Sequence, residues 1–267
     1  MKQFPTVGKD KEKQMDQRKN RDILYTQLAL EYNTTPAAFT TPGFTLTLPT
    51  KPASVRLFAK EVPFFSMACT GNSVVAMADE RLHPFLQALA GEVRDLHRLF
   101  EFPAMEKMNA ELKKYGYALW GNEHMYLPGQ AFPEFSIAPE FALKWFETEE
   151  AISTFYPNEK FRMALGEKYN PDRPDVIALA AMDGETIAAV AGASADMPDL
   201  WQVGIDVLAD YRGAGLGTAL VAALCKRIED MGKIPFYGTA AANVHSQIIA
   251  AKCGFYPTWV ETGAYKL

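Results

Sequence analysis

The stretch "DYRGAGLGTAL", residues 210–220, places Gly213, Gly215 and Gly217 at alternate positions just before an apolar helical pattern. Glycine adopts positive φ without steric cost, and its missing side chain lets a ligand approach the backbone. A helix start offers unpaired N–H groups and a partial positive charge, and Arg212 adds planar donors suited to phosphate. A tight turn without a ligand is the alternative. The combination favours a loop that holds a pyrophosphate.

Two common phosphate motifs do not fit this loop. The dinucleotide fingerprint G-x-G-x-x-G needs its third glycine one residue later and an acidic residue about 20 residues further on, where this chain has "KIPFYGT". The nucleoside-triphosphate loop needs a Lys-Ser or Lys-Thr pair after its last glycine, and none follows here. Both ligand classes are excluded.

The spacing Arg-x-x-Gly-x-Gly, formed by Arg212, Gly215 and Gly217, resembles the pyrophosphate loop of the GNAT superfamily, the acetyl-CoA-dependent N-acetyltransferases. A second block, "NVHSQIIAAKCGF" at residues 243–255, is similar to the family's N-x-x-[AS]-x-x-x-x-x-K-x-G-F ending. A hairpin signal at Asp183-Gly184 precedes both blocks, as in the family. The resemblance implies an α/β (α+β) fold with a mixed, bent sheet flanked by helices. It also implies acetyl transfer from acetyl-CoA, with CoA as product.

The resemblance further implies which residues bind the cofactor. Its thioester arm would enter where the strand ending near Val207 parts from the strand "IPFYGTA", and Ile205 and Val207 would present backbone groups to it. Asn243 would cap its helix and contact the pantetheine. The pyrophosphate would lie on the residues of the glycine loop, namely Arg212, Gly213, Ala214, Gly215, Leu216, Gly217 and Thr218.

The implied reaction is direct attack of a neutral amine on the acetyl thioester in a ternary complex. It needs an oxyanion donor and a proton for the leaving thiolate. The family assigns the oxyanion to the backbone N–H of Val207. Its usual acid is a tyrosine seven residues after the motif asparagine, and this chain has Ala250 there. Ser246, His245 and Tyr237 are the remaining candidate donors.

No motif identifies the base that deprotonates the ammonium either. Many members of the family carry a glutamate early in the strand before the loop, where this chain has Trp201. Asp206 lies in the same strand, and its alternation could direct it at a neighbouring helix. His245 is a candidate because histidine is a common general base, and the remaining acids, Asp196 and Asp199, would need a water relay.

The three cysteines, Cys69, Cys225 and Cys253, form no metal motif and no disulfide framework, which fits a reducing cytoplasm. Cys225 lies in an apolar helical pattern and Cys253 at an ordinary packing position of the family, so a covalent cysteine mechanism is not expected. No metal is expected either.

Composition sets outer bounds on the function. The chain has 267 residues, 48% of them hydrophobic and 22% charged, which indicates a globular protein with one large or two small domains. A net charge of −5 argues against general binding to nucleic acid or anionic membranes. No apolar run is long enough for a membrane span, and the charged N-terminus shows no secretion signal. These features predict a cytoplasmic location.

We predict a polar lead-in over residues 1–20, an N-terminal α/β domain over 21–130 and a GNAT acetyltransferase domain over 135–267. A Pro/Gly-rich seam separates the two domains at Leu127–Phe135. After the seam, "PEFALKWFETEEAISTFY" predicts a helix, and in the N-terminal half "DERLHPFLQALAGEVRDLHRLF" predicts another. "LKKYGYALWGNEHMYL" resembles the chain's final "AAKCGFYPTWVETGAYKL", which suggests a degenerate repeat in the N-terminal half, without a phosphate loop.

Three functions follow as hypotheses. The first is an N-acetyltransferase acting on the primary amine of a small molecule or peptide. The second is a non-catalytic acyl-CoA-binding sensor, which the missing tyrosine favours. The third is an interaction protein that kept the fold. The acceptor is not encoded in any motif, and the oligomeric state stays open between a monomer and a homodimer.

Overall fold

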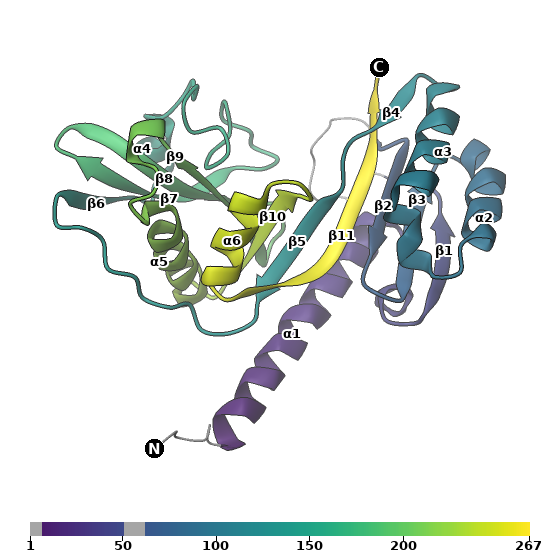
Figure 1. Cartoon of the computed structure of the whole chain (residues 1–267), viewed down its shortest axis with the longest axis horizontal. Coiled ribbons are helices and arrows are strands. Elements are labelled where there is room, and N and C mark those ends of the chain that lie inside the picture. Colours follow the sequence, from purple (N-terminus) through teal and green to yellow (C-terminus); the bar gives the residue numbers. More distant parts are fainter. Residues whose placement is uncertain (1–6, 51–61) are drawn as a thin grey trace. The chain divides into compact units, whose positions relative to one another are not determined.

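The computed structural model describes residues 7–50 and 62–267, with side chains from Gln17 onward. Contacts divide the chain into two compact units, whose elements are labelled in Figure 1. Unit 1 consists of Met1–Asn20, Tyr126–Gly238 and Asn243–Tyr256, and unit 2 of Arg21–Met125, Thr239–Ala242 and Pro257–Leu267. The end of the chain thus falls in unit 2, whereas the sequence analysis assigns it to the domain 135–267. The sequence-based boundaries stay predictions.

The sheet of unit 1 is mixed, as predicted. Its strands run in the order β10-β9-β8-β7-β6, with β9 and β10 parallel and the other neighbours antiparallel. Their bounds are β6 Phe141–Phe146, β7 Asp175–Asp183, β8 Thr186–Ser194, β9 Leu200–Val207 and β10 Ile234–Ala240. The predicted hairpin at Asp183-Gly184 is confirmed as the β7–β8 connection, where Gly184 has a φ of +57°.

Helices cover both faces of this sheet. Helix α5 (Leu216–Asp230) packs on one face of β7, β8 and β9, and its buried residues join the main apolar core of the unit. Helix α6 (Val244–Lys252) contacts α5, and α4 (Glu149–Ser153) packs on β7 within a second core on the other face. The small alanine side chains of β7 and β8 are fully buried and allow helix and loop backbone to approach the sheet closely.

One predicted helix of unit 1 is wrong. Residues 139–156 form strand β6 followed by the short helix α4, instead of a single helix. The segment Phe141–Phe146 pairs with β7 from Phe141↔Asp183 to Phe146↔Ala178, and its bulky aromatic residues suit a strand. Edge pairing to an existing sheet therefore outweighed the helical pattern, and Thr148 begins α4 by accepting a hydrogen bond from the N–H of Ala151.

The strands of unit 2 are hydrogen-bonded in the order β1-β3-β2-β11, with β4 also beside β11. Strand β1 runs parallel to β3, and the other pairs are antiparallel. The bounds are β1 Gly43–Thr47, β2 Phe65–Cys69, β3 Ser73–Ala78, β4 Tyr117–Leu119 and β11 Phe255–Lys266. Strand β5 (Glu123–Pro128) and helix α1 (Val7–Glu31) carry residues of both units.

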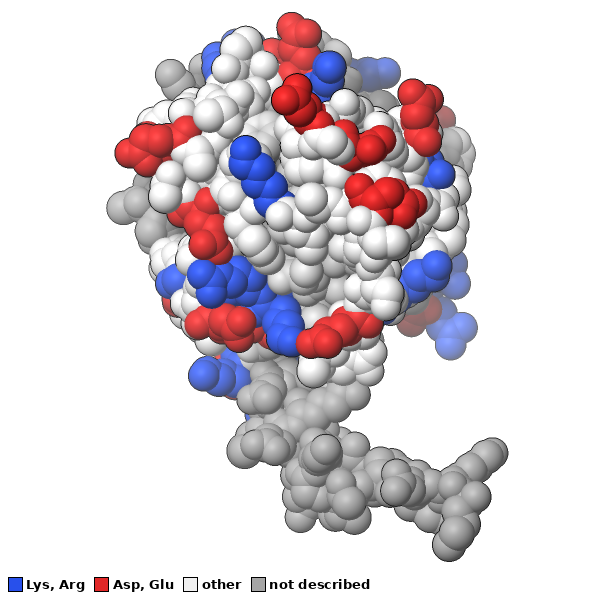
Figure 2. All heavy atoms as spheres, turned by 90° about the vertical axis from the view of Figure 1, so that its left-hand side faces the viewer, with Lys and Arg blue, Asp and Glu red and all other residues white. Residues whose placement is uncertain are grey.

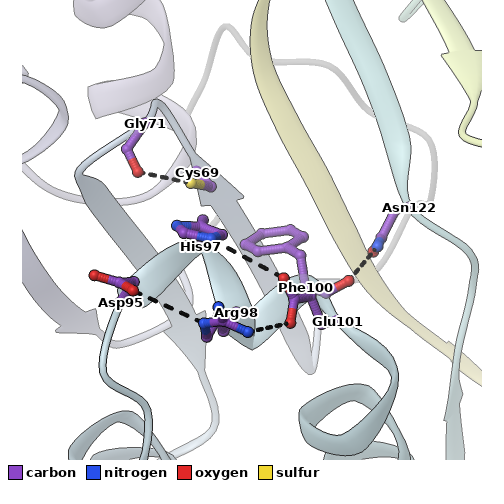
Figure 3. A network of polar contacts seen from close by, with 8 residues as sticks. All are labelled: Cys69, Gly71, Asp95, His97, Arg98, Phe100, Glu101 and Asn122. Atoms are coloured by element: carbon purple, nitrogen blue, oxygen red, sulfur yellow. Dashed lines mark hydrogen bonds and ion pairs between the residues drawn. The ribbon is translucent and has the colours of Figure 1, made fainter.

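The predicted helix over residues 79–100 is interrupted. Helix α2 (His83–Glu92) has Pro84 in its first turn and is followed by Val93, whose backbone is extended. A short 3-10 helix, η3 (Leu96–Phe100), follows before α3 (Phe102–Lys113). Figure 3 shows Arg98 of η3 between Asp95 and Glu101, and Asn122 donating to the carbonyl oxygen of Phe100. Such exposed ion pairs contribute little to stability.

Candidate active site

Strands β9 and β10 part in the middle. Their parallel pairing runs from Ile234↔Leu200 to Tyr237↔Val203, although β9 continues to Val207 and β10 to Ala240. The sequence analysis expected the cofactor arm to enter between these two strands. Beyond Val203, therefore, the backbone of β9 has an edge that β10 does not cover, within the described part of the chain.

The antiparallel register with β8 shows which residues face that edge. The N–H of Leu208 donates to the carbonyl oxygen of Ala188 at 3.0 Å, so Leu208 and every second residue before it direct their backbone groups toward β8. Ile205 and Val207 alternate with them and direct their N–H and C=O groups away from β8, toward the open edge. These are the two residues that the sequence analysis proposed for contact with the thioester arm.

The glycine loop follows directly. Gly213 and Gly215 have φ values of +88° and +79°, in the left-handed region that favours glycine, and a Cβ added at either one would meet no atom within 4 Å. Gly215 is the N-cap of α5 and supplies no side-chain cap. The first N–H groups of α5 therefore lack intrahelical acceptors, beside open space and an exposed glycine backbone. This geometry fits an anion such as pyrophosphate.

Arg212 and Tyr211 border the loop. The Arg212 guanidinium is exposed, and its Nε donates to the carbonyl oxygen of Val207 at 3.3 Å, so the side chain lies along the open edge of β9. The Tyr211 hydroxyl donates to Asp183 at 3.0 Å, and its ring packs edge-to-face on Phe141. These contacts fix the turn that leads from β9 into the loop.

Gly217 joins the two helices to the open edge. A Cβ at this position would lie 3.2 Å from Ile249 of α6, 3.5 Å from Val207 and 3.7 Å from Ile205. The first turn of α5 thus lies against the side chains of the open β9 segment and against α6. Glycine at 217 keeps this first turn close to both.

Helix α6 begins as the sequence predicts. Asn243 is its N-cap, and the side-chain oxygen accepts a hydrogen bond from the N–H of Ser246 at 3.2 Å. The Ser246 hydroxyl lies 2.8 Å from the hydroxyl of Tyr237, which is buried on β10. Burial raises the pKa of Tyr237 to about 12. Two of the candidate proton donors are therefore in contact, while the third, His245, is exposed at the start of α6.

The other face of β9 is covered by a loop. Gly204 and Gly192 lie opposite each other on β9 and β8. A Cβ on Gly204 would be 1.8 Å from the carbonyl oxygen of Met163, and one on Gly192 would be 2.3 Å from that of Ala164. The backbone of residues 163–164 therefore rests directly on the sheet, next to the point where β9 and β10 part.

Asp206 holds this loop. Its Oδ2 accepts hydrogen bonds from the N–H of Met163 at 2.7 Å and from that of Ala164 at 3.0 Å. Burial raises the pKa of Asp206, and the two backbone donors oppose that rise. The sequence analysis left open that Asp206 could be directed at a neighbouring helix. It faces the loop instead, on the side of the sheet away from α5.

Two further polar residues fix the same segment, which we call the 158–166 loop. Asn158 is buried, accepts from the N–H of Phe161 at 2.9 Å, and donates to carbonyl oxygens of the loop, at Phe161, Leu165 and Gly166. Asp175 accepts from the N–H of Gly166 at 2.8 Å and from the hydroxyl of Tyr156. Met163 projects from this fixed backbone with 73% of its surface exposed.

The remaining predicted acids lie at the start of β9. Asp196 is buried, and its Oδ1 accepts from Arg173 at 2.7 Å and from Ser194 at 2.5 Å. Its Oδ2 is buried without a partner among the described residues. Asp199 is exposed and pairs with Lys233 at 3.3 Å. Trp201, at the position of the family glutamate, is a buried core residue.

Sequence reasoning missed the contact of Tyr237 with Ser246 and the whole 158–166 loop. A signal for the loop was present, because isolated glycines inside a strand mark close approach of other backbone. Gly192 and Gly204 are two such glycines, and only the register of β8 and β9 reveals that they face each other.

On the face drawn in Figure 2, basic and acidic side chains are interspersed around a wide uncharged area. Within residues 7–50 and 62–267, no cluster of three His, Cys, Asp or Glu is placed to hold a metal ion. No helix in this described part has the length and apolar character to cross a membrane.

One segment of the chain matches a known protein family. Residues 141–255, from the start of β6 to the start of β11, match the Acetyltransferase (GNAT) family. No curated protein sequence matches the chain.

Solved structures of GNAT proteins are similar to it. A GCN5-related N-acetyltransferase-like protein from Streptococcus suis has 18% identity and a TM-score of 0.45, over 66% of this chain and 76% of that one. An acetyltransferase from Colwellia psychrerythraea has 15% identity and a TM-score of 0.40, over 59% of this chain and 61% of that one. A GCN5-related N-acetyltransferase from Sphaerobacter thermophilus has 12% identity and a TM-score of 0.45, over 77% of each chain.

Proposed function

Residues 141–255 belong to the Acetyltransferase (GNAT) family and form an acyltransferase domain; from this premise we propose that the chain is an N-acetyltransferase. It transfers an acetyl group from acetyl-CoA to a primary amine, by direct attack in a ternary complex. The observation that carries the proposal is the open edge of β9 beside the glycine-lined start of α5. The two features meet at Gly217.

The residues present fit CoA. The exposed backbone of Gly213–Gly215, the free N–H groups at the start of α5 and the Arg212 guanidinium offer donors to a pyrophosphate. Ala214, Leu216, Gly217 and Thr218 complete the loop and the first turn. The amides of a pantetheine would pair with Ile205 and Val207, whose backbone groups face the open edge. Asn243, at the start of α6, adds a side-chain amide.

When bound, acetyl-CoA supplies the activated thioester. We assign the backbone N–H of Val207 as the oxyanion donor and Ser246 as the donor to the leaving sulfur. Asp206 and His245 are the candidate bases for the ammonium. A raised pKa supports Asp206, although its Oδ2 already accepts two backbone hydrogen bonds. Exposure at the start of α6 supports His245.

The acceptor is the primary amine of a small molecule or peptide. The net charge of −5 favours a cationic amine, and the interspersed charges of Figure 2 do not form a basic surface for nucleic acid. We place the protein in the cytoplasm, without a membrane partner, as a monomer or a homodimer.

CoA and acetyl-CoA are expected to stabilise the fold, because they bind the loop of the folded chain and not the unfolded one. At a concentration a hundredfold above Kd, the free energy of unfolding should rise by about 2.7 kcal/mol. A thermal-shift titration measures this directly. No shift up to millimolar CoA would contradict the cofactor assignment.

The alternative function, a non-catalytic acyl-CoA sensor, is favoured by Ala250 at the place of the family's tyrosine. Release of free thiol from acetyl-CoA, followed with a panel of primary amines, distinguishes the two. The proposed enzyme releases thiol only when its amine is present. A sensor gives the same thermal shift with acetyl-CoA and no amine-dependent release with any member of the panel.

A further inference from the structure

Strand β6 is the last strand on one side of the sheet of unit 1, within the described part of the chain (Figure 1). The residues from Ala142 to Trp145 are all exposed, whereas a strand beside a core usually buries one face. Leu143 keeps 46% of its surface exposed and Trp145 keeps 39%. These two residues are two positions apart, so they lie on the same face of the strand. Two large apolar side chains are thus offered to solvent on one edge strand.

The register of the sheet shows which backbone groups of β6 face outward. Ala188 of β8 accepts from the N–H of Leu208, so every second residue of β8 from Ala188 onward directs its backbone groups to β9, and the residues between them to β7. The registers of β7 with β8 and with β6 carry this alternation across the sheet. The β6 residues whose N–H and C=O groups point away from β7 are therefore Phe141, Leu143 and Trp145. The N–H of Phe141 agrees with this, because it donates to the carbonyl oxygen of Ala138 in the preceding turn.

The usual protection of an edge strand is weak on β6. Natural edge strands are commonly protected by proline, by a β-bulge or by an outward charged side chain. This strand contains no proline, and it pairs with β7 without a shift of register. Its charged residue, Lys144, turns back over its own strand, with Nζ 5.1 Å from the centre of the Phe146 ring. The outward N–H and C=O groups of β6 are therefore accessible to another strand.

We propose that a second copy of this chain pairs with β6, so that the two strands run antiparallel about a two-fold axis at Leu143. Most soluble homo-oligomers are symmetric, and a two-fold interface presents the same residues from both subunits. A strand of another protein would need a matching sequence, whereas β6 supplies its own match. The inference goes beyond the proposed function and holds whether or not the chain transfers acetyl groups.

This register brings apolar side chains together across the axis. Leu143 lies opposite Leu143 of the partner subunit, and Phe141 lies opposite Trp145 of the partner subunit, which are pairs of a kind that stabilises sheets. The outward N–H groups of Leu143 and Trp145 meet the outward C=O groups of the partner subunit. Each of these hydrogen bonds forms twice because of the symmetry. None of them requires the N–H of Phe141, which is already used within the chain.

The neighbouring registers are less favourable. An axis at Lys144 would set that lysine directly against Lys144 of the partner subunit, where like charges repel. An axis at Ala142 would set Trp145 against Pro139, which has no N–H to donate. Leu143 is therefore the centre that the sequence of β6 favours. A single strand pair is small for an interface, so we expect a weak dimer that dissociates on dilution.

Analytical ultracentrifugation of the whole chain, from low to several hundred micromolar, tests the inference without any ligand. The wild type should sediment as a monomer at the dilute end and approach twice the mass of one chain at the concentrated end. Leu143→Lys and Leu143→Glu each set like charges against each other at the axis, so each should weaken the dimer about tenfold or more. An equal mixture of the two variants pairs opposite charges there and should recover much of the dimer.

Trp145→Glu removes the aromatic pair without changing the residue at the axis, and it should also weaken association about tenfold. Phe102→Lys is the matched control, because it adds a charge at an apolar residue of unit 2 that is 77% exposed. This control should dimerise like the wild type. Circular dichroism checks that each variant is folded.

A wild type that stays monomeric throughout would overturn the inference. A dimer that both Leu143 variants leave intact would overturn it as well, since the interface would then lie elsewhere. Variants that weaken the dimer singly, with no recovery on mixing, would contradict the two-fold axis at Leu143. The thermal shift with CoA tests the proposed function separately, and neither result depends on the other.

Discussion

Gly215→Glu should abolish CoA binding while the chain stays folded. The new side chain would enter the open space at the start of α5, where no atom now lies within 4 Å of a Cβ. Its carboxylate would occupy the positive end of the helix and repel a pyrophosphate. We expect at least a hundredfold loss of affinity, equivalent to about 2.7 kcal/mol, measured by calorimetry.

Gly232→Glu is the matched control for this change. Gly232 follows the other end of α5, has a φ of +74° and also has nothing within 4 Å of a Cβ. Both variants therefore carry the same left-handed strain, about 1–2 kcal/mol. Gly232→Glu should bind CoA like the wild type. Equal affinities of the two variants, with native circular dichroism, would contradict the site.

Gly204→Ala should destabilise unit 1 strongly. Its methyl group would overlap the carbonyl oxygen of Met163, 1.8 Å away, and the carbonyl carbon, 2.8 Å away. Both are backbone atoms of the 158–166 loop, which Asp206 holds, so neither atom can move away without a large cost in free energy. We expect the free energy of unfolding to fall by about 3 kcal/mol, or the loop to leave the sheet. Denaturant unfolding measures the first and limited trypsin cleavage at Arg162 the second.

Gly91→Ala supplies the comparison, because its added methyl group meets nothing within 4 Å and its φ is ordinary. Alanine in a helix is more favourable than glycine by up to about 1 kcal/mol, so this variant should be as stable as the wild type or slightly more. Gly204→Ala with wild-type stability and wild-type resistance to trypsin would show that the loop does not rest on the sheet.

The sequence predicted the part of the site that depends on local geometry. The turn at Gly213 and Gly215 and the helix cap at Asn243 were predictable from the sequence, because positive φ and helix capping depend on a few neighbouring residues. The strand and helix that frame the loop were also predicted, since alternation and helical period are visible over short segments. That the strand ending near Val207 lies beside the strand "IPFYGTA" followed from a family resemblance rather than from the residues themselves.

The rest of the site depends on contacts between distant segments. Asp206 accepts hydrogen bonds from the N–H groups of Met163 and Ala164, which lie 43 and 42 residues earlier in the chain, and no local pattern signals these bonds. The pairing of Phe141–Phe146 with β7 overrode a helical pattern because the edge of an existing sheet was available. Register and edges are tertiary properties, which a single sequence does not display.

The structure of unit 2 favours the expectation that the chain binds one cofactor, in unit 1 alone. Its own strand-to-helix connection follows β3, where Asp79 accepts a hydrogen bond from the N–H of Arg81 and so occupies the helix start. The parallel neighbour of β3 pairs with it from Gly43↔Ser73 to Thr47↔Met77, without parting. Neither a free anion site nor an open edge is present at this connection, although the unit resembles a degenerate repeat by sequence.

Calorimetric titration of the whole chain with CoA tests the central claim most directly, because it counts the sites. We predict one CoA per chain for the wild type and for Gly232→Glu, and no binding heat for Gly215→Glu. Two CoA per chain, with one site surviving Gly215→Glu, would show that unit 2 binds the cofactor as well. Undiminished binding to Gly215→Glu at one per chain would place the site elsewhere and contradict the account.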